Sequence, residues 1–300
     1  MRKIKVIKLN DNTRRIVSVD NPKSHKINKI HKIDVPAPRV PIKQPKKVSN
    51  VANIKPIKIN QARIVKPIKN KSINIVKDKK HDQKILNIKN CGVGKILVMV
   101  ACGPSVSEID ITKLVNNDSI HIMVINKPIM KINPEYWAFC DNSQYVRNKD
   151  VFNSYGKLTI TSSSVRAQKQ NQIIIRPVHG EGIKRDLRDG YVIGRSSVYA
   201  NIQVALWMNY DKIFIFGVDM CEVNGKLHHY GVNPDVSQAE RIKRFGYEEY
   251  HYNIMSEKMP EDLRNKIYFC SSYNKRKFVD KFNKLDHKLA IEEILKNVQK

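Results

Sequence analysis

The chain has 300 residues, a formal net charge of +27 and 41% hydrophobic residues, a size typical of one or two domains. Its longest apolar run, residues 96–101, is too short to cross a bilayer, so we expect no transmembrane segment. The five cysteines follow no zinc-binding spacing and lie in or near apolar runs. This favours buried thiols in a reducing cytoplasm, which is the host cytoplasm if the source is viral.

Residues 1–90 differ from the rest of the chain in charge and in aromatic content. They hold 25 Lys and Arg against 5 Asp, and the first aromatic residue of the chain is Tyr136. Seven prolines interrupt an alternation of Ile or Val with Lys or Asn, and each proline removes a strand hydrogen-bond donor. We therefore expect a basic, largely disordered tail over residues 1–90 and one folded domain over residues 91–300.

Three interpretations of the tail stay open. It is a solvated linker without a specific partner, an arm that binds nucleic acid or another polyanion, or a segment that binds an anionic membrane surface. Because it has no aromatic residues for base stacking, its nucleic-acid binding would be directed at the backbone and would weaken with salt. A Lys-, Ile- and Asn-rich composition also follows from an AT-rich genome.

From residue 94 onward, short apolar runs alternate with segments of helical pattern. The runs predict strands over residues 95–101, 119–125, 136–140, 157–161, 172–176, 212–216 and 266–270. Helices are expected over residues 197–208, 237–255 and 275–297, and another after Ser105, which has capping-box spacing to Glu108. This order predicts a Rossmann-like α/β fold, in which a mostly parallel sheet carries helices on both faces.

Small or polar residues follow five of the expected strands. In open parallel sheets, ligands bind beyond the carboxyl ends of the strands, so these residues predict one shared cleft. Turn chemistry alone places such residues in loops as well. The candidates are Gly103, Pro104 and Ser105 after the first strand, Asn126 after the second, Asp141 and Asn142 after the third, Gly217 and Asp219 after the strand at 212–216, and Ser271 after the last.

Two of the loops lead into expected helices and are candidate phosphate sites. The N–H groups at a helix N-terminus attract anions, at Gly103-Pro104-Ser105 and at Gly194-Arg195-Ser196-Ser197, where Arg195 adds charge. The alternatives are an ordinary strand-to-helix turn at the first and helix capping by Ser196 or Ser197 at the second. For Asp219, binding of a ribose hydroxyl, coordination of Mg²⁺ and capping of the next turn all stay open.

His228 and His229 are the candidates for a general base, because histidine exchanges protons near neutral pH. Adjacent residues on an extended chain point to opposite sides, so at most one of them faces the cleft. Joint metal ligation is therefore not expected, and no metal site is predicted. A surface or packing role is the alternative for both, and His121 and His287 are expected to be structural.

In this order, the motifs resemble one superfamily over about residues 94–285. It groups small bacterial sialyltransferases, motility accessory factor glycosyltransferases that modify flagellin, and archaeal 6-hydroxymethylpterin pyrophosphokinases. Ala101 stands where the family pattern has its first glycine, and the tail has no counterpart. The matching motifs are Val100-Ala101-Cys102-Gly103-Pro104-Ser105, Ile125-Asn126, Cys140-Asp141-Asn142, Arg195-Ser196-Ser197-Val198-Tyr199 and Ile213-Phe214-Ile215-Phe216-Gly217-Val218-Asp219.

The resemblance implies a nucleotide in the cleft and a histidine that acts as general base. By resemblance, the phosphates lie at Gly103, Pro104 and Ser105, the donor pocket at Asn126 and Asn142, and the donor group near Ser196 and Ser197. The implied activity is transfer of a sugar from a CMP- or UDP-linked donor, a reaction that can involve Mg²⁺ but does not require it. The alternatives are a Mg²⁺-dependent pyrophosphokinase and a non-catalytic nucleic-acid or assembly-binding protein that acts through its tail. The acceptor and the oligomeric state are not predicted.

Overall fold

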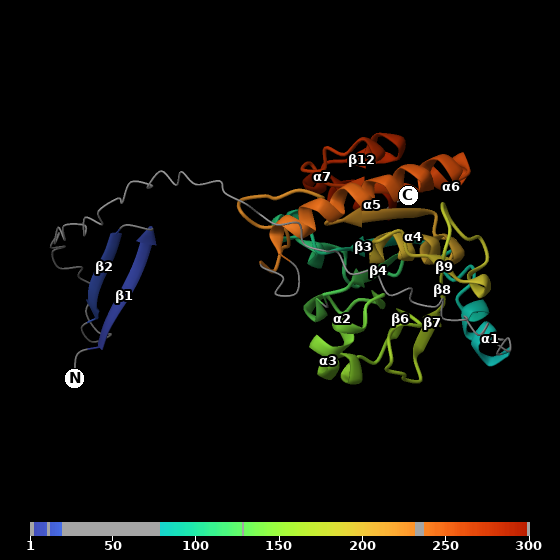
Figure 1. Cartoon of the computed structure of the whole chain (residues 1–300), viewed down its shortest axis with the longest axis horizontal. Helices are drawn as coiled ribbons and strands as arrows, with labels where there is room; N and C mark the ends of the chain where they lie inside the picture. The colour runs from blue at the N-terminus through green and yellow to red at the C-terminus, as the bar shows by residue number, and fades with distance from the viewer. Residues whose placement is uncertain (1–2, 11–12, 20–78, 128, 232–236, 299–300) are drawn as a thin grey trace, which may run out of the picture. The chain divides into compact units, whose positions relative to one another are not determined.

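The structure, a computed structural model, describes residues 3–10, 13–19, 79–127, 129–231 and 237–298 (Figure 1). The chain divides into two units, Met1–Lys69 and Asn70–Lys300. In the first unit, β1 (Lys3–Asn10) and β2 (Thr13–Val19) pair as an antiparallel hairpin rich in β-branched residues. Part of the tail therefore has strand structure, and the expected disorder of residues 20–78 lies outside the described residues.

The folded domain begins before the predicted boundary at residue 91. Helix α1 (Lys79–Asn87) belongs to it, because Ile85 and Ile88 are buried in the same hydrophobic cluster as one face of the sheet. The indole nitrogen of Trp207 also donates a hydrogen bond of 2.9 Å to the carbonyl of Ile85. The domain boundary predicted from composition lies too late in the chain because the exposed lysines of this helix resemble those of the tail.

The domain is built on one eight-stranded sheet whose neighbouring strands are all parallel. Its strand order is β12-β11-β10-β3-β4-β5-β6-β7, which confirms the predicted Rossmann-like α/β fold. The strands are β3 (Ile96–Val100), β4 (Ile120–Ile125), β5 (Tyr136–Phe139), β6 (Leu158–Ser162), β7 (Gln172–Ile175), β10 (Lys212–Phe216), β11 (Ile267–Cys270) and β12 (Asn283–Leu285). A separate parallel pair joins β8 (Pro177–Val178) to β9 (Tyr191–Val192).

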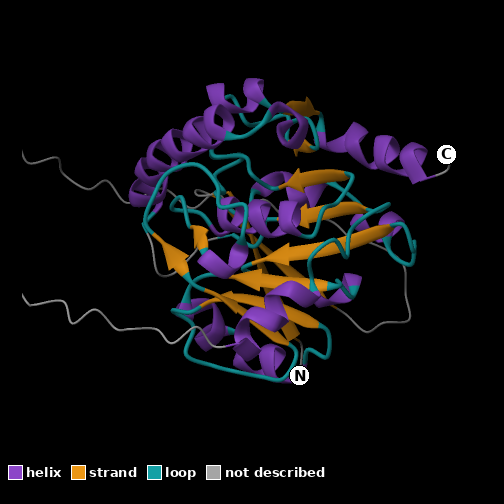
Figure 2. Cartoon of the chain, turned by 90° about the vertical axis from the view of Figure 1, so that its right-hand side faces the viewer, coloured by secondary structure: helices purple, strands orange, loops and turns teal. Residues whose placement is uncertain are grey.

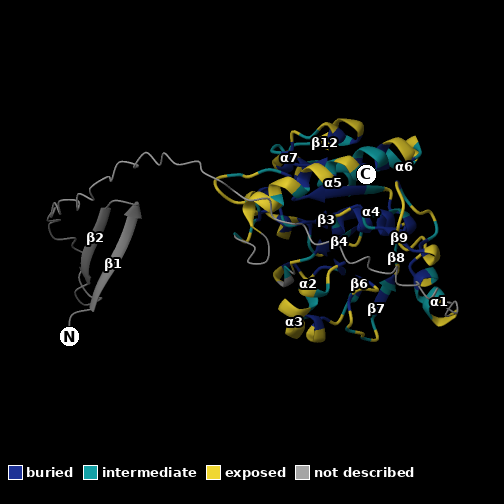
Figure 3. Ribbon diagram, in the orientation of Figure 1, coloured by how far each residue is buried: buried dark blue, intermediate teal, exposed yellow. Residues whose placement is uncertain are grey.

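Helices cover both faces of the sheet (Figure 2), and the strands are buried on both sides (Figure 3). Successive residues of β3 point to opposite faces, so Leu97 and Met99 join one hydrophobic cluster while Val98 and Val100 join the other. The first cluster includes residues of α1, α4 (Ser197–Trp207) and α5 (Gln238–Lys258), and the second includes residues of α3 (Lys149–Ser154) and α7 (His287–Val298). The remaining α-helices are α2 (Asn142–Arg147) and α6 (Glu261–Arg264).

The predicted strands are present, and so are the helices expected at 197–208 and 237–255. The helix expected over 275–297 is wrong in its first half, which instead forms a 3-10 helix (Lys277–Lys281) and β12. Phe278 and Phe282 of this segment pack on Phe269 of β11, and these tertiary contacts override the local helical pattern. None of the helices that the structure describes combines the length and apolarity needed to cross a bilayer.

The direction of strand addition reverses between β3 and β10. From β3 the chain adds β4, β5, β6 and β7 toward one edge of the sheet, and after α4 it returns to place β10 on the other side of β3. The loops that follow β3 and β10 therefore lead away from each other at the carboxyl edge. Such a switch point leaves a crevice where open α/β sheets bind their ligands.

Candidate functional site

A cleft that is partly open to solvent lies at this switch point. It opens beyond the carboxyl ends of β3, β4, β5 and β10, as predicted. The predicted residues that line it are Gly103, Asn126, Asp141, Arg195, Ser196, Ser197, Gly217, Asp219 and His228. Pro104, Ser105, Asn142 and His229 are not part of the lining.

Asp219 holds the two diverging loops together. It is 1% exposed, and its carboxylate accepts hydrogen bonds from the Ser105 N–H (2.8 Å), the Ser105 hydroxyl (2.7 Å) and the Ser271 hydroxyl. Gly103 donates its N–H to the Gly217 carbonyl at 2.8 Å, and a Cβ on Gly103 would lie 2.4 Å from the Asp219 carboxylate. Glycine is therefore required at 103 for close approach of the two backbones.

These contacts change the role expected of the loop after β3. Both donors of Ser105 already bind Asp219, so the predicted phosphate contact at Ser105 is wrong. The helix that follows is a five-residue 3-10 helix (Pro104–Glu108) with Gly103 at its N-cap, so the predicted capping box is also wrong. The Glu108 carboxylate instead accepts a hydrogen bond of 2.6 Å from the Tyr273 hydroxyl.

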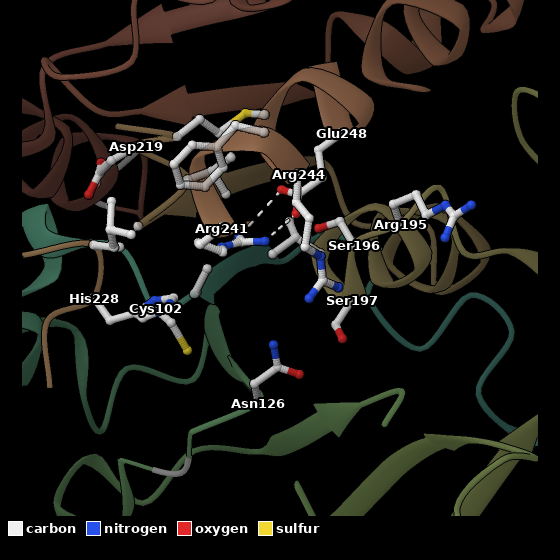
Figure 4. A pocket seen from close by; sticks show the side chains of 18 of the residues that line it. Cys102, Asn126, Arg195, Ser196, Ser197, Asp219, His228, Arg241, Arg244 and Glu248 are labelled. Atoms are coloured by element: carbon white, nitrogen blue, oxygen red, sulfur yellow. Dashed lines mark hydrogen bonds and ion pairs between the residues drawn. The ribbon is translucent and has the colours of Figure 1, made fainter. Parts of the chain in front are cut away.

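Asn126 presents an unused amide to the cleft. Its backbone has a positive φ of 64°, and its N–H donates to the Ala138 carbonyl at 2.9 Å, which fixes the residue at the end of β4. Its side-chain oxygen is buried without a hydrogen-bond partner, and the amide points into the cleft (Figure 4). A ligand that donates to this oxygen would satisfy it. The predicted companion Asn142 is directed elsewhere, because its side-chain oxygen accepts from the Arg166 N–H at 3.1 Å.

The amino-terminal end of α4 borders the cleft and is not capped by a side chain. Ser196 occupies the N-cap position, but its hydroxyl lies 3.4 Å from the Tyr252 hydroxyl and makes no capping hydrogen bond. The first N–H groups of a helix have no intrahelical acceptor, so this helix end favours an anion. Arg195 is exposed, and its guanidinium is turned away from Asn126 and His228 (Figure 4).

Backbone strain also concentrates at the cleft. Among the described residues, eight non-glycine positions have a positive φ, and six of these are asparagines, which tolerate that conformation. The other two, Arg195 (63°) and Met220 (51°), both line the cleft. A strained conformation persists where the surrounding structure constrains it, as it does at binding sites.

Helix α5 contributes a charged wall that the sequence analysis missed. Arg241 pairs with the buried carboxylate of Glu248 and stacks over the Phe245 ring at 4.7 Å, whereas Arg244 extends into the cleft toward α4 (Figure 4). Burial raises the pKa of Glu248, and the adjacent Arg241 opposes that shift. The i, i+3, i+7 spacing of Arg241, Arg244 and Glu248 placed them on one helical face, but nothing in the sequence showed that this face meets the cleft.

The structure distinguishes between the two candidate histidines. His228 lines the cleft, is 9% exposed and stacks on Tyr230 with ring centres 5.0 Å apart. Burial, and next the positive charge of Arg241, lower the pKa of His228 to about 4, so its imidazole is neutral at neutral pH. His229 is not part of the lining, and its backbone N–H donates to the Cys102 carbonyl at 2.9 Å. His228 is therefore the residue placed to accept a proton in the cleft.

The buried, neutral His228 is expected to make the stability of the fold depend on pH. Because its folded-state pKa of about 4 lies below the ordinary value of 6.5, the unfolded state binds more protons between these pH values. His228 therefore does not lower the free energy of unfolding above pH 6.5. As the pH falls toward 4, the free energy of unfolding decreases, by about 2 kcal/mol at pH 4.5. Urea unfolding at pH 7 and 4.5 should show a smaller loss for His228→Gln than for the wild type. The same loss in both proteins would contradict the assignment.

No group of three or more His, Cys, Asp or Glu side chains is placed to hold a metal ion in the part of the chain that the structure describes. Comparison of the chain with protein-family models, with curated proteins and with solved structures gives no match. The assignment of a function therefore depends on the geometry of the cleft.

Proposed function

We propose that this chain is a glycosyltransferase, which binds a nucleotide-activated sugar in the cleft and transfers the sugar to an acceptor hydroxyl. One observation carries the proposal: a neutral histidine and two arginines line the same cleft. His228 supplies a proton acceptor, and Arg241 and Arg244 supply positive charge. A base for the acceptor and a counter-charge for the departing phosphate are the two groups that this reaction needs.

The phosphate side of the cleft is formed by Arg244 and the first turn of α4. Arg244 extends toward this helix end (Figure 4), so its guanidinium and the free N–H groups of Ser197 and Val198 converge on one anion. Negative charge grows on the nucleotide phosphate as its bond to the sugar breaks. Fixed donors aimed at that charge stabilise the transition state more than the ground state.

His228 acts on the opposite side of the reaction. The acceptor hydroxyl gives its proton to the imidazole while its oxygen forms a bond to the anomeric carbon, and the nucleotide leaves with the electrons of the broken carbon–oxygen bond. The charge of Arg241 helps to hold the pKa of His228 low in the empty cleft. A bound phosphate neutralises part of that charge, so donor binding raises the basicity of His228 when it is needed.

In this scheme Asp219 is a positioning residue, because its carboxylate is occupied by Ser105 and Ser271. The arginines provide the positive charge that Mg²⁺ would provide in pyrophosphoryl transfer. This arrangement favours a nucleotide-sugar donor over the alternative in which ATP and Mg²⁺ drive a pyrophosphokinase reaction.

A thermal-shift experiment on the full chain with CMP, UDP, GDP, and ATP with Mg²⁺ tests the proposal. A nucleotide that binds only the folded state raises the free energy of unfolding by roughly 2.7 kcal/mol when its concentration is about 100 times its dissociation constant. We expect CMP or UDP to raise the melting temperature, and Arg244→Gln to weaken that affinity about tenfold by removing a charged phosphate donor. Arg185→Gln, at an exposed arginine outside the cleft, is the matched control and should bind as the wild type does.

The remaining outcomes separate the alternatives. A shift with ATP and Mg²⁺ alone would replace the proposal with pyrophosphoryl transfer. The absence of any shift would favour a non-catalytic protein that binds nucleic acid through residues 1–90.

A further inference from the structure

Exposed aromatic rings lie in the lining of the cleft and on the helix that forms one of its walls. Large hydrophobic side chains are exposed at seven described positions, and three of them are aromatic: Tyr230 (37% exposed), Tyr247 (55%) and Tyr250 (56%). Tyr230 lines the cleft itself, and Tyr247 and Tyr250 lie on α5, the helix that contributes Arg241 and Arg244. The most exposed rings of the described domain thus occur on two of the segments that form its candidate site.

Helical spacing connects these tyrosines to the cleft. Arg244, Tyr247 and Tyr250 follow one another at intervals of three residues, so they form a row that begins at the cleft and winds toward the outer face of α5. The Tyr250 hydroxyl donates to Glu181 at 3.2 Å, and its ring contacts His251 with centres 5.4 Å apart. His251 in turn contacts Tyr199 in the first turn of α4, so this part of α5 packs against the helix that borders the cleft.

Cations also occur on the segments that carry these rings. The Lys127 ammonium lies 5.9 Å from the centre of the Tyr230 ring. Burial and then the positive charge of Arg195, which lines the cleft, lower the pKa of His251 on α5. Lys243 is also exposed on this helix. Aromatic faces interleaved with cations form the kind of surface on which single-stranded nucleic acid binds, because bases stack on the rings and phosphates pair with the cations.

The charge of the protein favours this ligand over a neutral one. A neutral glycan or peptide would gain little from Lys127, Arg195 and Lys243. A polyanion gains from these groups, and residues 91–300, with 30 Lys and Arg against 23 Asp and Glu, are themselves basic. Among polyanions, nucleic acid also offers flat bases for Tyr247 and Tyr250.

We infer that the acceptor in the proposed transfer is a single-stranded nucleic acid, which stacks bases on Tyr247 and Tyr250 and brings a hydroxyl to His228. This inference rests on the proposed function. The hydroxyl oxygen forms the new bond to the sugar, its proton passes to His228, and the nucleotide of the donor leaves as an anion. A duplex stacks its bases internally, so it cannot use the two rings in the same way.

Fluorescence anisotropy with the full chain and a labelled oligothymidylate of about 12 nucleotides tests the inference. Tyr247→Ala combined with Tyr250→Ala should weaken binding at least about tenfold, since each lost stacking contact costs roughly fivefold or more. Tyr247→Phe combined with Tyr250→Phe keeps the rings and should bind within about twofold of the wild type. Leu289→Ala, at another exposed apolar residue, should also leave binding unchanged.

Binding of a duplex of the same length serves as a control for the contribution of the basic residues 1–90, which are the same in every variant. We expect the double alanine variant to bind that duplex as the wild type does. Unchanged affinity of this variant for the single strand would overturn the inference, and an equal loss for strand and duplex would do the same. Thermal shifts with nucleotides, measured on the same variants, distinguish a failure of the proposed acceptor from a failure of the proposed transferase activity. A normal CMP or UDP shift with tyrosine-independent strand binding refutes the acceptor alone, whereas the absence of any shift refutes the transferase.

Discussion

Replacement of Asp219 by alanine is expected to lower the free energy of unfolding by about 3–5 kcal/mol. The substitution leaves the Ser105 N–H, the Ser105 hydroxyl and the Ser271 hydroxyl without their acceptor at a position that is 1% exposed. Water cannot readily replace the carboxylate there, so each donor bears a desolvation cost. Urea denaturation monitored by circular dichroism measures the change.

Asp141→Ala is the matched control for this substitution. Asp141 is an exposed carboxylate that also lines the cleft, so its removal should change stability by less than about 0.5 kcal/mol. If instead Asp219 contacts the donor directly, Asp219→Ala should fold with near wild-type stability and lose nucleotide binding. A loss below about 1 kcal/mol would therefore contradict the positioning role.

His228→Gln is expected to reduce sugar transfer by about 10²- to 10⁴-fold while leaving nucleotide affinity nearly unchanged. Glutamine retains polarity and approximate size but cannot accept the proton of the acceptor hydroxyl at neutral pH. The measurement is transfer from whichever donor class the thermal shifts identify, with unfolding curves recorded to show that the variant is folded.

His229→Gln provides a control at the adjacent residue. Its side chain lies outside the lining of the cleft, so we expect less than about a fivefold effect on transfer. If His228→Gln stays within a few-fold of the wild type, the general-base assignment is wrong. A larger effect at His229 than at His228 would mean that the segment rearranges when substrate binds.

The strands and the edge that carries the cleft were predictable because both follow from local sequence. Buried parallel strands appear as continuous apolar runs, and the residues after them meet at one edge, which brought Gly103, Asn126 and Gly217 together.

The contacts that define the roles of the residues were not predictable, because they join distant parts of the chain. Ser105 and Asp219 are separated by 114 positions, and either residue alone fits a phosphate or metal site as well as it fits a hydrogen bond within the protein. The helix that carries Arg241 and Arg244 was predicted, but its orientation depends on how Phe245 and Tyr252 pack in the core. Tertiary packing decides which face of a helix meets a ligand.

The position of β10 beside β3 also constrains the order in which the protein can fold. β3 pairs at once with β4, the next strand in sequence, but its other edge stays open until β10 has been synthesised more than a hundred residues later. During translation an apolar central strand therefore exposes unpaired backbone groups, a state prone to aggregation. The link from Ser105 to Asp219 closes at the same late moment, so a chain that ends before residue 219 has neither a complete sheet nor a cleft. We expect folding to be slow for a domain of this size, since its central pairing is also among its most distant in sequence.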